Sequence, residues 1–189
     1  MLKDYEHNAK YYETDQMGCV HHSNYIRWME EARVDLMDQM GCGYRAMEEA
    51  GVCSPVLEVN CRYKSMVRFG DTVRIHAWIK EYNGIRMTIG YEMRDVSSGE
   101  LRTRAESAHC FLTLDGRPVS LKRSYPEWDK LFRNMSEMEA GTVMRVCRVS
   151  APFSSTASSP DIPIMAKGLS WASHATVMAV KPTPAATPS

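Results

Sequence analysis

The chain has 189 residues, enough for one domain with a substantial core and a tail but short for two ordinary domains. Its 23 Lys and Arg residues balance its 23 Asp and Glu residues, which excludes an overall field that would favour nucleic acid, so an anionic ligand must be held by local basic groups. The N-terminus lacks an apolar signal segment, the chain has no run of about 18 apolar residues, and its six cysteines show no C-x-x-C spacing. We therefore expect a cytoplasmic protein with no membrane span.

A long helix is predicted to begin at Asn24, where the apolar pattern of the chain changes. Residues 2–12 are polar and aromatic, which is compatible with an edge strand, and residues 13–23 are expected to form a loop. From Asn24 the apolar side chains recur every three or four positions, as on one face of a helix of about 17 residues. Ser23 is the expected N-cap, and Gly41 is the expected residue just beyond the C-terminus. The apolar face comprises Tyr25, Trp28, Met29, Ala32, Leu36 and Met40.

Strands are predicted for the segment after Pro55, and a short helix over residues 44–50 is expected to precede them. Apolar and polar residues alternate in this segment, as they do when one face of a strand is buried. The dipeptide Asn83-Gly84 suits a two-residue hairpin turn. The strand segments are residues 57–64, 73–80, 85–93 and 101–114. The sequence therefore predicts an α+β fold in which a meander of four antiparallel strands wraps around one long central helix.

The C-terminal quarter of the chain has a different composition. Residues 119–138 are an ordinary polar extension with a short helix expected near residues 126–135. Of the 50 residues from 140 to 189, 28 are Ala, Ser, Thr or Pro, and such a segment buries too little apolar surface to offset its ordering entropy. We therefore expect a folded domain over residues 1–138 and a disordered low-complexity tail over residues 139–189.

The densest group of reactive side chains lies in the loop before the long helix. A helix N-terminus offers unpaired backbone N–H groups and a partial positive charge, which stabilise an oxyanion that develops on an attacked carbonyl. A carboxylate just before such a terminus can attack the carbonyl or activate a water beside it. Asp15 is that carboxylate, and the amides from His22 to Asn24 are the expected oxyanion donors.

This loop and the helix after it resemble the 4-hydroxybenzoyl-CoA thioesterase family of hot-dog-fold proteins, particularly its bacterial acyl-CoA branch. The family pattern combines an aromatic residue, a Thr-Asp pair, a glycine and a His, Asn or Tyr at fixed spacing, followed by an acidic residue and Ala-Arg inside the helix. The matching positions are Tyr11, Thr14, Asp15, Gly18, His22, Tyr25, Glu31, Ala32 and Arg33. The resemblance covers roughly residues 3–133 and is most specific over the first forty.

The resemblance implies a hot-dog thioesterase that hydrolyses a small-molecule acyl-CoA to a free acid and CoA. Asp15 would be the nucleophile or the general base, and Tyr11 and His22 would assist it. A thiolate is a good leaving group with a pKa of about 8.5, so a sparse set of catalytic groups can suffice. The resemblance also implies homodimers or homotetramers with active sites at the subunit interface.

Cys19 and the adjacent His21 and His22 offer two other chemistries. They could be metal ligands, but no metal-binding pattern is completed nearby and adjacent histidines seldom both face one ion. Cys19 could be a nucleophile activated by a neighbouring histidine, although a buried, inert cysteine is commoner. The chain has no G-x-S-x-G motif, which disfavours a serine hydrolase. We therefore expect no metal and no organic cofactor.

Basic residues in the strand region are candidates for binding the phosphates of CoA. Lys64 and Arg68 lie in one basic stretch, and Arg102 and Arg104 are alternatives. Exposed basic side chains are also routine on sheets, so a solvated strand face is the favoured explanation for each of them. Lys64 and Arg68 remain our substrate-binding candidates.

Two other functions are compatible with the sequence. A non-catalytic hot-dog protein that binds acyl-CoA or an acyl carrier would keep the same loop. A hot-dog hydratase or dehydratase would use a different spacing of its acidic residue and histidine from the Asp15 to His22 interval. The sequence therefore favours the hydrolase, with the binding protein as its alternative.

Overall fold

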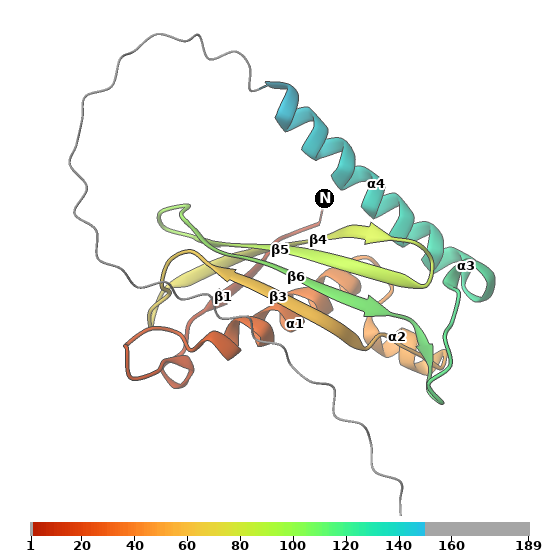
Figure 1. The fold of residues 1–189 in the computed structure, drawn as a ribbon, viewed down its shortest axis with the longest axis horizontal. Coiled ribbons are helices and arrows are strands. Elements are labelled where there is room, and N and C mark those ends of the chain that lie inside the picture. Colours follow the sequence, from red (N-terminus) through yellow and green to blue (C-terminus); the bar gives the residue numbers. More distant parts are fainter. Residues whose placement is uncertain (1, 150–189) are drawn as a thin grey trace, which may run out of the picture. The chain divides into compact units, whose positions relative to one another are not determined.

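An antiparallel sheet lies against the long helix that begins at His22 in the computed structural model, which describes residues 2–149 (Figure 1). For residues 139–149 it describes the helical backbone without the side chains. The elements in chain order are β1 (Tyr5–Asn8), η1 (Tyr11–Glu13), α1 (His22–Gln39), α2 (Tyr44–Glu49), β2 (Val52–Cys53), β3 (Val56–Tyr63), β4 (Thr72–Tyr82), β5 (Arg86–Asp95), β6 (Leu101–Cys110), β7 (Leu112–Thr113), α3 (Leu121–Ser124) and α4 (Pro126–Val149). The predicted α+β class is confirmed.

The five-stranded sheet has the order β1-β4-β5-β6-β3, and every neighbouring pair in it is antiparallel. The expected edge strand within residues 2–12 is β1. The predicted four-strand meander is wrong in one respect, because β3 pairs with β6 at the far edge and not with β4. Residues 64–71 join β3 to β4, and this connection is long enough to cross the sheet, whereas a tight hairpin would have made the two strands neighbours.

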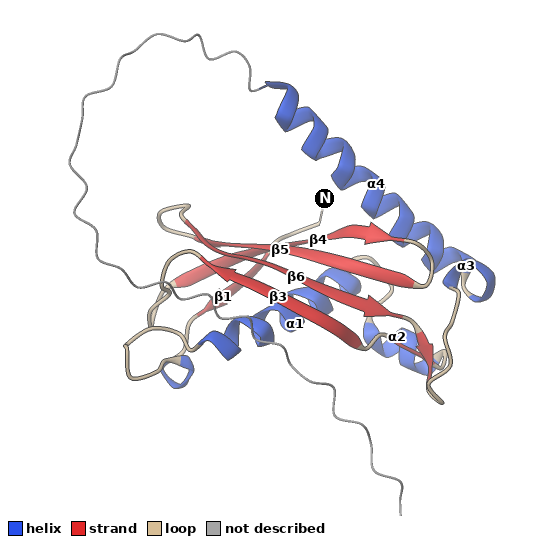
Figure 2. Cartoon of the chain, viewed as in Figure 1, coloured by secondary structure: helices blue, strands red, loops and turns tan. Residues whose placement is uncertain are grey.

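The apolar faces predicted for the central strands are buried. In β4, Val73 and Ile75 are fully buried, and in β5 so are Ile89 and Met93. They form one core cluster with the apolar face of α1, the helix that lies against the sheet in Figure 2. Because β3 is an edge strand, its alternating residues are less buried than those of β4 and β5.

Helix α1 begins two residues earlier than expected, at His22. The expected N-cap, Ser23, lies inside the helix, and His21 caps it, since the Nδ1 atom of His21 accepts a hydrogen bond from the Ser23 amide at 3.3 Å. A ring nitrogen can replace a hydroxyl as the acceptor for an unpaired amide of the first turn. At the other end, Gly41 has a φ of 78° just after the helix, as predicted.

The predicted strand over residues 101–114 is interrupted at Phe111. Strand β6 ends at Cys110, and β7 pairs with β2 in a separate two-stranded sheet. The Phe111 side chain is fully buried against Tyr82 and Phe132. Burying this ring turns the chain out of the main sheet, and the alternation of residue types along the segment does not record that bend.

The turn between β4 and β5 is longer than the predicted two-residue hairpin. Within this turn only Gly84 has a positive φ, of 90°. All described residues with a positive φ are glycines. The side-chain oxygen of Asn83 accepts hydrogen bonds from the amides of Ile85 and Arg86. The asparagine thus closes the turn through its side chain, in the manner of an Asx turn.

Helix α4 is longer than the helix expected over residues 126–135. It runs through residue 138, where we expect the folded domain to end, and continues to Val149. Phe132 anchors it in the core. From residue 150 onward the expected disordered tail lies outside the described residues. None of the helices within residues 2–149 has the length and apolar character needed to cross a membrane.

Candidate active site

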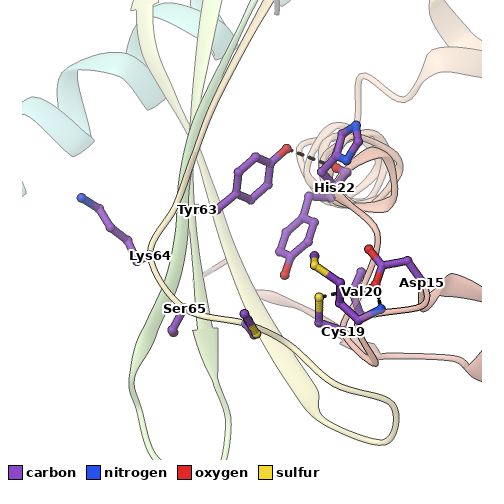
Figure 3. Close-up of a pocket in the computed structure, with 10 residues that line it drawn as sticks. Asp15, Cys19, Val20, His22, Tyr63, Lys64 and Ser65 are labelled. Carbon is purple, nitrogen blue, oxygen red and sulfur yellow. Dashed lines mark hydrogen bonds between the residues drawn. The ribbon is translucent and has the colours of Figure 1, made fainter. Parts of the chain in front are cut away.

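A pocket of about 300 Å³ lies at the N-terminus of α1 (Figure 3). Its walls come from the loop before α1, from the first turn of the helix and from the end of β3 with the residues after it. The lining residues are Asp15, Met17, Cys19, Val20, His22, Tyr25, Tyr63, Lys64, Ser65 and Met66. The structure therefore brings Asp15 and His22, predicted from the sequence, to one mostly apolar pocket.

The loop that carries Asp15 is closed by its own hydrogen bonds. The amide of Asp15 donates to the carbonyl of Cys19 at 2.9 Å, and the amide of Gly18 donates to the carbonyl of Asp15 at 3.0 Å. Gly18 has a φ of 69°, which glycine adopts without strain. The carboxylate oxygen Oδ1 of Asp15 accepts from the amide of Met17 at 2.8 Å. Asp15 is thus held by its main chain and by one carboxylate oxygen.

The first amides of α1 differ in whether they already have an acceptor. The amide of Ser23 donates to the ring of His21, and the amide of Asn24 donates to the carbonyl of His21 at 2.9 Å. The amide of His22 has no acceptor in the backbone of residues 2–149 or the side chains of residues 2–138. Of the three amides expected to serve as oxyanion donors, that of His22 is therefore free to bind a ligand.

A second set of contacts joins the base of the loop to the same helix. The carbonyl of Glu13 accepts from the amide of His21 at 2.8 Å and from the side-chain amide of Asn24 at 2.7 Å. The carboxylate of Glu13 is buried and accepts from Nε1 of Trp28 at 2.8 Å. Burial would raise the pKa of Glu13, but hydrogen bonds from Lys10, Trp28 and His7 outweigh it and lower that pKa.

Two tyrosines line the pocket, Tyr25 from α1 and Tyr63 from the end of β3. The Tyr63 hydroxyl donates to the carbonyl of His22 at 3.2 Å, and its ring meets that of Tyr25 edge-on with centroids 5.0 Å apart. Burial raises the pKa of Tyr25 to about 12 and raises that of Tyr63 as well. Both phenols therefore remain protonated near neutral pH and do not act as bases. The alternation pattern marks Tyr63 only as a strand residue and gives no sign of this contact.

The cysteine in the pocket is not activated. Burial raises the pKa of the Cys19 thiol, and the neighbouring Asp15 carboxylate raises it further. The Sγ atom of Cys19 lies 3.7 Å from Oδ1 of Asp15. A thiol reacts as its thiolate, so these surroundings argue against the cysteine nucleophile considered from the sequence.

The other predicted site residues, Tyr11, Lys64 and Arg68, lie at different places relative to the pocket. Tyr11 is 77% exposed, packs edge-on against Phe69 and is not part of the pocket lining. Lys64 borders the pocket, but its side chain points away from Asp15 (Figure 3). Arg68 donates to the carbonyl of Gly18 at 3.3 Å and so tethers the Asp15 loop.

The alternative basic residues already have acidic partners. Arg102 is within 3.0 Å of both Asp95 and Glu100, and Arg104 is 2.7 Å from Glu92. Their charges are therefore neutralised locally, which leaves Lys64 and Arg68 as the better candidates for an anionic ligand. Within the described residues there is no group of three or more His, Cys, Asp or Glu side chains that could hold a metal ion.

Comparison with known proteins gives a consistent family. The model of the thioesterase-like superfamily matches residues 10–155. The Bacillus subtilis protein YneP, to which acyl-CoA thioesterase activity is provisionally ascribed, is 39% identical over 124 residues, which is 65% of this chain and 89% of that protein.

A crystal structure of a DHNA-CoA thioesterase from Staphylococcus aureus superposes with a TM-score of 0.70 at 30% identity, over 74% of this chain and 94% of that one. A crystal structure of an Aquifex aeolicus protein of no assigned function superposes with a TM-score of 0.61 at 30% identity, over 66% of this chain and 96% of that one. The narrower resemblance to the 4-hydroxybenzoyl-CoA branch stays a prediction. The chain belongs to the thioesterase-like superfamily, shares its hot-dog fold and is a thioester hydrolase.

Proposed function

We propose that this protein hydrolyses acyl-CoA thioesters to a free acid and CoA, with Asp15 as the catalytic carboxylate. The observation that carries the proposal is the shared pocket of Asp15 and the first turn of α1, in which the His22 amide is unengaged. The names of the Bacillus subtilis and Staphylococcus aureus relatives, which specify CoA thioesters, support the choice of substrate.

The oxyanion would form beside the amide of His22. Attack on a thioester carbonyl transfers negative charge to its oxygen, and a free backbone N–H at a helix N-terminus stabilises that charge without reorganising. Removing one such donor in other enzymes costs about 100- to 1000-fold in kcat. We infer that the His22 amide is the main donor, because those of Ser23 and Asn24 already have acceptors.

Asp15 would act as the nucleophile or as the general base. As a nucleophile its carboxylate would form a mixed anhydride and expel the CoA thiolate, and water would then hydrolyse the anhydride. As a base it would take a proton from a water that attacks the same carbonyl. Both routes need the carboxylate beside the His22 amide. The His22 side chain, which is exposed at the start of α1, would assist in orienting the substrate or water.

Tyr11 can assist catalysis as proposed only if a second subunit encloses it together with the substrate. It lies on the same chain segment as Asp15 but faces outward with Phe69. A second subunit packed over this region would enclose it, in keeping with an active site at a subunit interface. We also propose that the protein belongs to the 4-hydroxybenzoyl-CoA branch, on the basis of the motif that includes Tyr11 and Asp15.

A thiol-release assay tests the proposal as a whole. The purified protein is incubated with short-chain, medium-chain and aromatic acyl-CoA substrates, and free CoA is measured. Release from at least one class, well above the uncatalysed rate, is expected. Tight binding of acyl-CoA without release from any class would instead support the non-catalytic binding protein.

We propose that Lys64 and Arg68 bind the phosphates of CoA. Neither side chain has a carboxylate within ion-pair distance among the side chains of residues 2–138, which the structure describes, and Lys64 borders the pocket. Replacing either with Gln is expected to raise the KM for acyl-CoA by about tenfold, the effect of one charge-assisted hydrogen bond.

The matched control for these variants is the corresponding acyl-pantetheine, which has the same thioester but lacks the nucleotide phosphates. Its KM should not change in a variant that has lost only a phosphate contact. An equal rise for both substrates would show that the residue shapes the loop instead, a specific concern for Arg68 because of its bond to Gly18.

We also propose that the protein forms a homodimer through β3, with a homotetramer as a further assembly. β3 is at an edge of the sheet, and its apolar residues Val56, Leu57 and Tyr63 are 46–50% exposed. An exposed apolar edge strand favours pairing with another strand. Light scattering is expected to give at least twice the 21.5 kDa mass of the chain, and a strictly monomeric active protein would contradict this assembly.

A further inference from the structure

A buried carboxylate lies two residues before Asp15, and the reaction as described does not use it. Glu13 is 5% exposed and ends the short helix η1. A buried carboxylate is costly unless hydrogen-bond donors surround it. Glu13 has such donors, and they come from three separate parts of the chain.

Three donors converge on the Glu13 carboxylate. The amide of Lys10 donates to Oε2 at 2.6 Å, the indole Nε1 of Trp28 donates to Oε1 at 2.8 Å, and Nε2 of His7 lies 3.0 Å from Oε2. His7 belongs to β1 and Trp28 to the second turn of α1. The carboxylate therefore joins the first strand, the reactive loop and the long helix.

His7 extends these contacts to a second carboxylate. Its other ring nitrogen, Nδ1, lies 3.3 Å from Oε2 of Glu31 on α1, and its ring packs against Trp28 with centroids 4.6 Å apart. The Tyr5 hydroxyl donates to the same Glu31 oxygen at 3.0 Å. The side chains around Glu13 are thus fixed in turn, which leaves its carboxylate little freedom to move.

The main chain of Glu13 fixes the other side of the pocket. Its carbonyl accepts from the amide of His21, which caps α1, and from the side chain of Asn24 in the first helical turn. One residue therefore sets where the Asp15 loop begins and where α1 begins. These two anchor points tie the start of the Asp15 loop to the first turn of α1.

We propose that Glu13 is a positioning residue for catalysis, whose buried carboxylate and carbonyl hold Asp15 in register with the free amide of His22. This inference rests on the proposed function and deepens it. Glu13 itself would not touch the substrate, because it lies outside the pocket lining. Misplacing a catalytic group by about 1 Å can cost about 100-fold in rate, so a small shift of this anchor has a large effect.

The main test is the variant Glu13→Gln. Gln has the same shape, but its amide NH₂ group cannot accept hydrogen bonds, so it cannot satisfy all three donors. We expect kcat for acyl-CoA hydrolysis to fall by about 10- to 100-fold, with KM changed by less than about threefold. Trp28→Phe removes the indole N–H donor and keeps an aromatic side chain, although a smaller one, and we expect a smaller fall in kcat of the same kind.

Asp129→Asn is the matched control. Asp129 is also a buried carboxylate and accepts from Tyr82 and Arg133, but it lies on α4 and does not contact the pocket. It should lower the melting temperature about as much as Glu13→Gln while leaving kcat unchanged. A similar fall of kcat in both variants would show that general destabilisation is the cause, and would overturn the positioning role.

A double-mutant cycle shows whether Glu13 acts through Asp15. In the Asp15→Asn background, adding Glu13→Gln should lower kcat by less than about twofold, because there is no carboxylate left to position. Fully additive losses would overturn the proposal. If Glu13→Gln does not fold, Trp28→Phe decides, and wild-type kcat in that variant would refute the inference.

The cycle also separates this inference from the proposed function. Wild-type activity in Asp15→Asn alone would refute the catalytic role of Asp15. Loss of activity in Asp15→Asn with unchanged kcat in Glu13→Gln would leave that role standing and refute only the role of Glu13.

Discussion

The variant Asp15→Asn should lose at least about a thousandfold in kcat for acyl-CoA hydrolysis, within the range that carboxylate nucleophiles and general bases contribute. The amide is a poor nucleophile and a poor base, so either proposed route fails. The loop should keep its shape, because the Asn side-chain oxygen can still accept from the Met17 amide that now binds Oδ1 of Asp15. Free CoA release at saturating substrate, together with the melting temperature, measures both effects.

Asp71→Asn is a suitable control for this experiment. Asp71 also accepts a backbone hydrogen bond, from the amide of Arg68 at 2.8 Å, but it does not line the pocket. Its kcat should stay within about twofold of wild type. Near wild-type turnover by Asp15→Asn on a good substrate would remove Asp15 from the mechanism, even if the protein proves to be an active thioesterase.

The second large effect concerns stability in acid and comes from His109. This side chain is fully buried on β6, and its Nε2 atom lies 2.7 Å from the hydroxyl of Ser107. Burial, together with the nearby guanidinium of Arg33, lowers the pKa of His109 to about 4, from an ordinary value of 6.5. The buried Arg33 contacts the ring at 2.8 Å and so opposes a second positive charge.

The direction of the pH effect follows from the two pKa values. Between pH 6.5 and 4 the unfolded chain binds a proton at His109 and the folded chain does not, so acid favours unfolding. This contribution to stability is fully present above about pH 6.5 and is lost as the pH falls toward 4. The difference corresponds to about 3 kcal/mol, a large share of the 5–15 kcal/mol typical of a folded domain.

Urea unfolding at pH 7 and at pH 4 measures this loss. The lowered pKa values of Glu13 and Glu92 also make the protein less stable in acid, so the comparison is with His109→Gln, which cannot titrate. The free energy of unfolding of the variant should fall by about 3 kcal/mol less than that of wild type. Parallel pH dependences in the two proteins would show that His109 does not contribute.

Local residue patterns were sufficient for most of the secondary structure. Periods of 3.6 and 2 specify which face of α1, β4 and β5 is buried, because they depend only on residues close together in the chain. The same patterns did not place β3 beside β6, because strand pairing depends on the route taken by the segment that joins β3 to β4. They also did not predict the bend at Phe111, whose ring packs against Tyr82 of β4 and Phe132 of α4.

The candidate site shows the same division. Asp15 and His22 could be proposed from the sequence, because both lie within one short segment that ends at a helix N-terminus. The sequence did not single out Glu13, because nothing in the local pattern shows that its carboxylate is buried. Its importance depends on contacts with β1 and α1, which reach from His7 to Trp28.

By itself the sequence determined the α+β class, the long helix with its glycine terminus and the loop that carries Asp15. Only the tertiary structure decided which amide of α1 remains free, that Arg68 tethers the Asp15 loop through Gly18 and that Tyr11 faces outward. The physical reason is that periodicity and capping act between near neighbours, whereas burial and hydrogen bonding of a given group depend on residues far away in the chain.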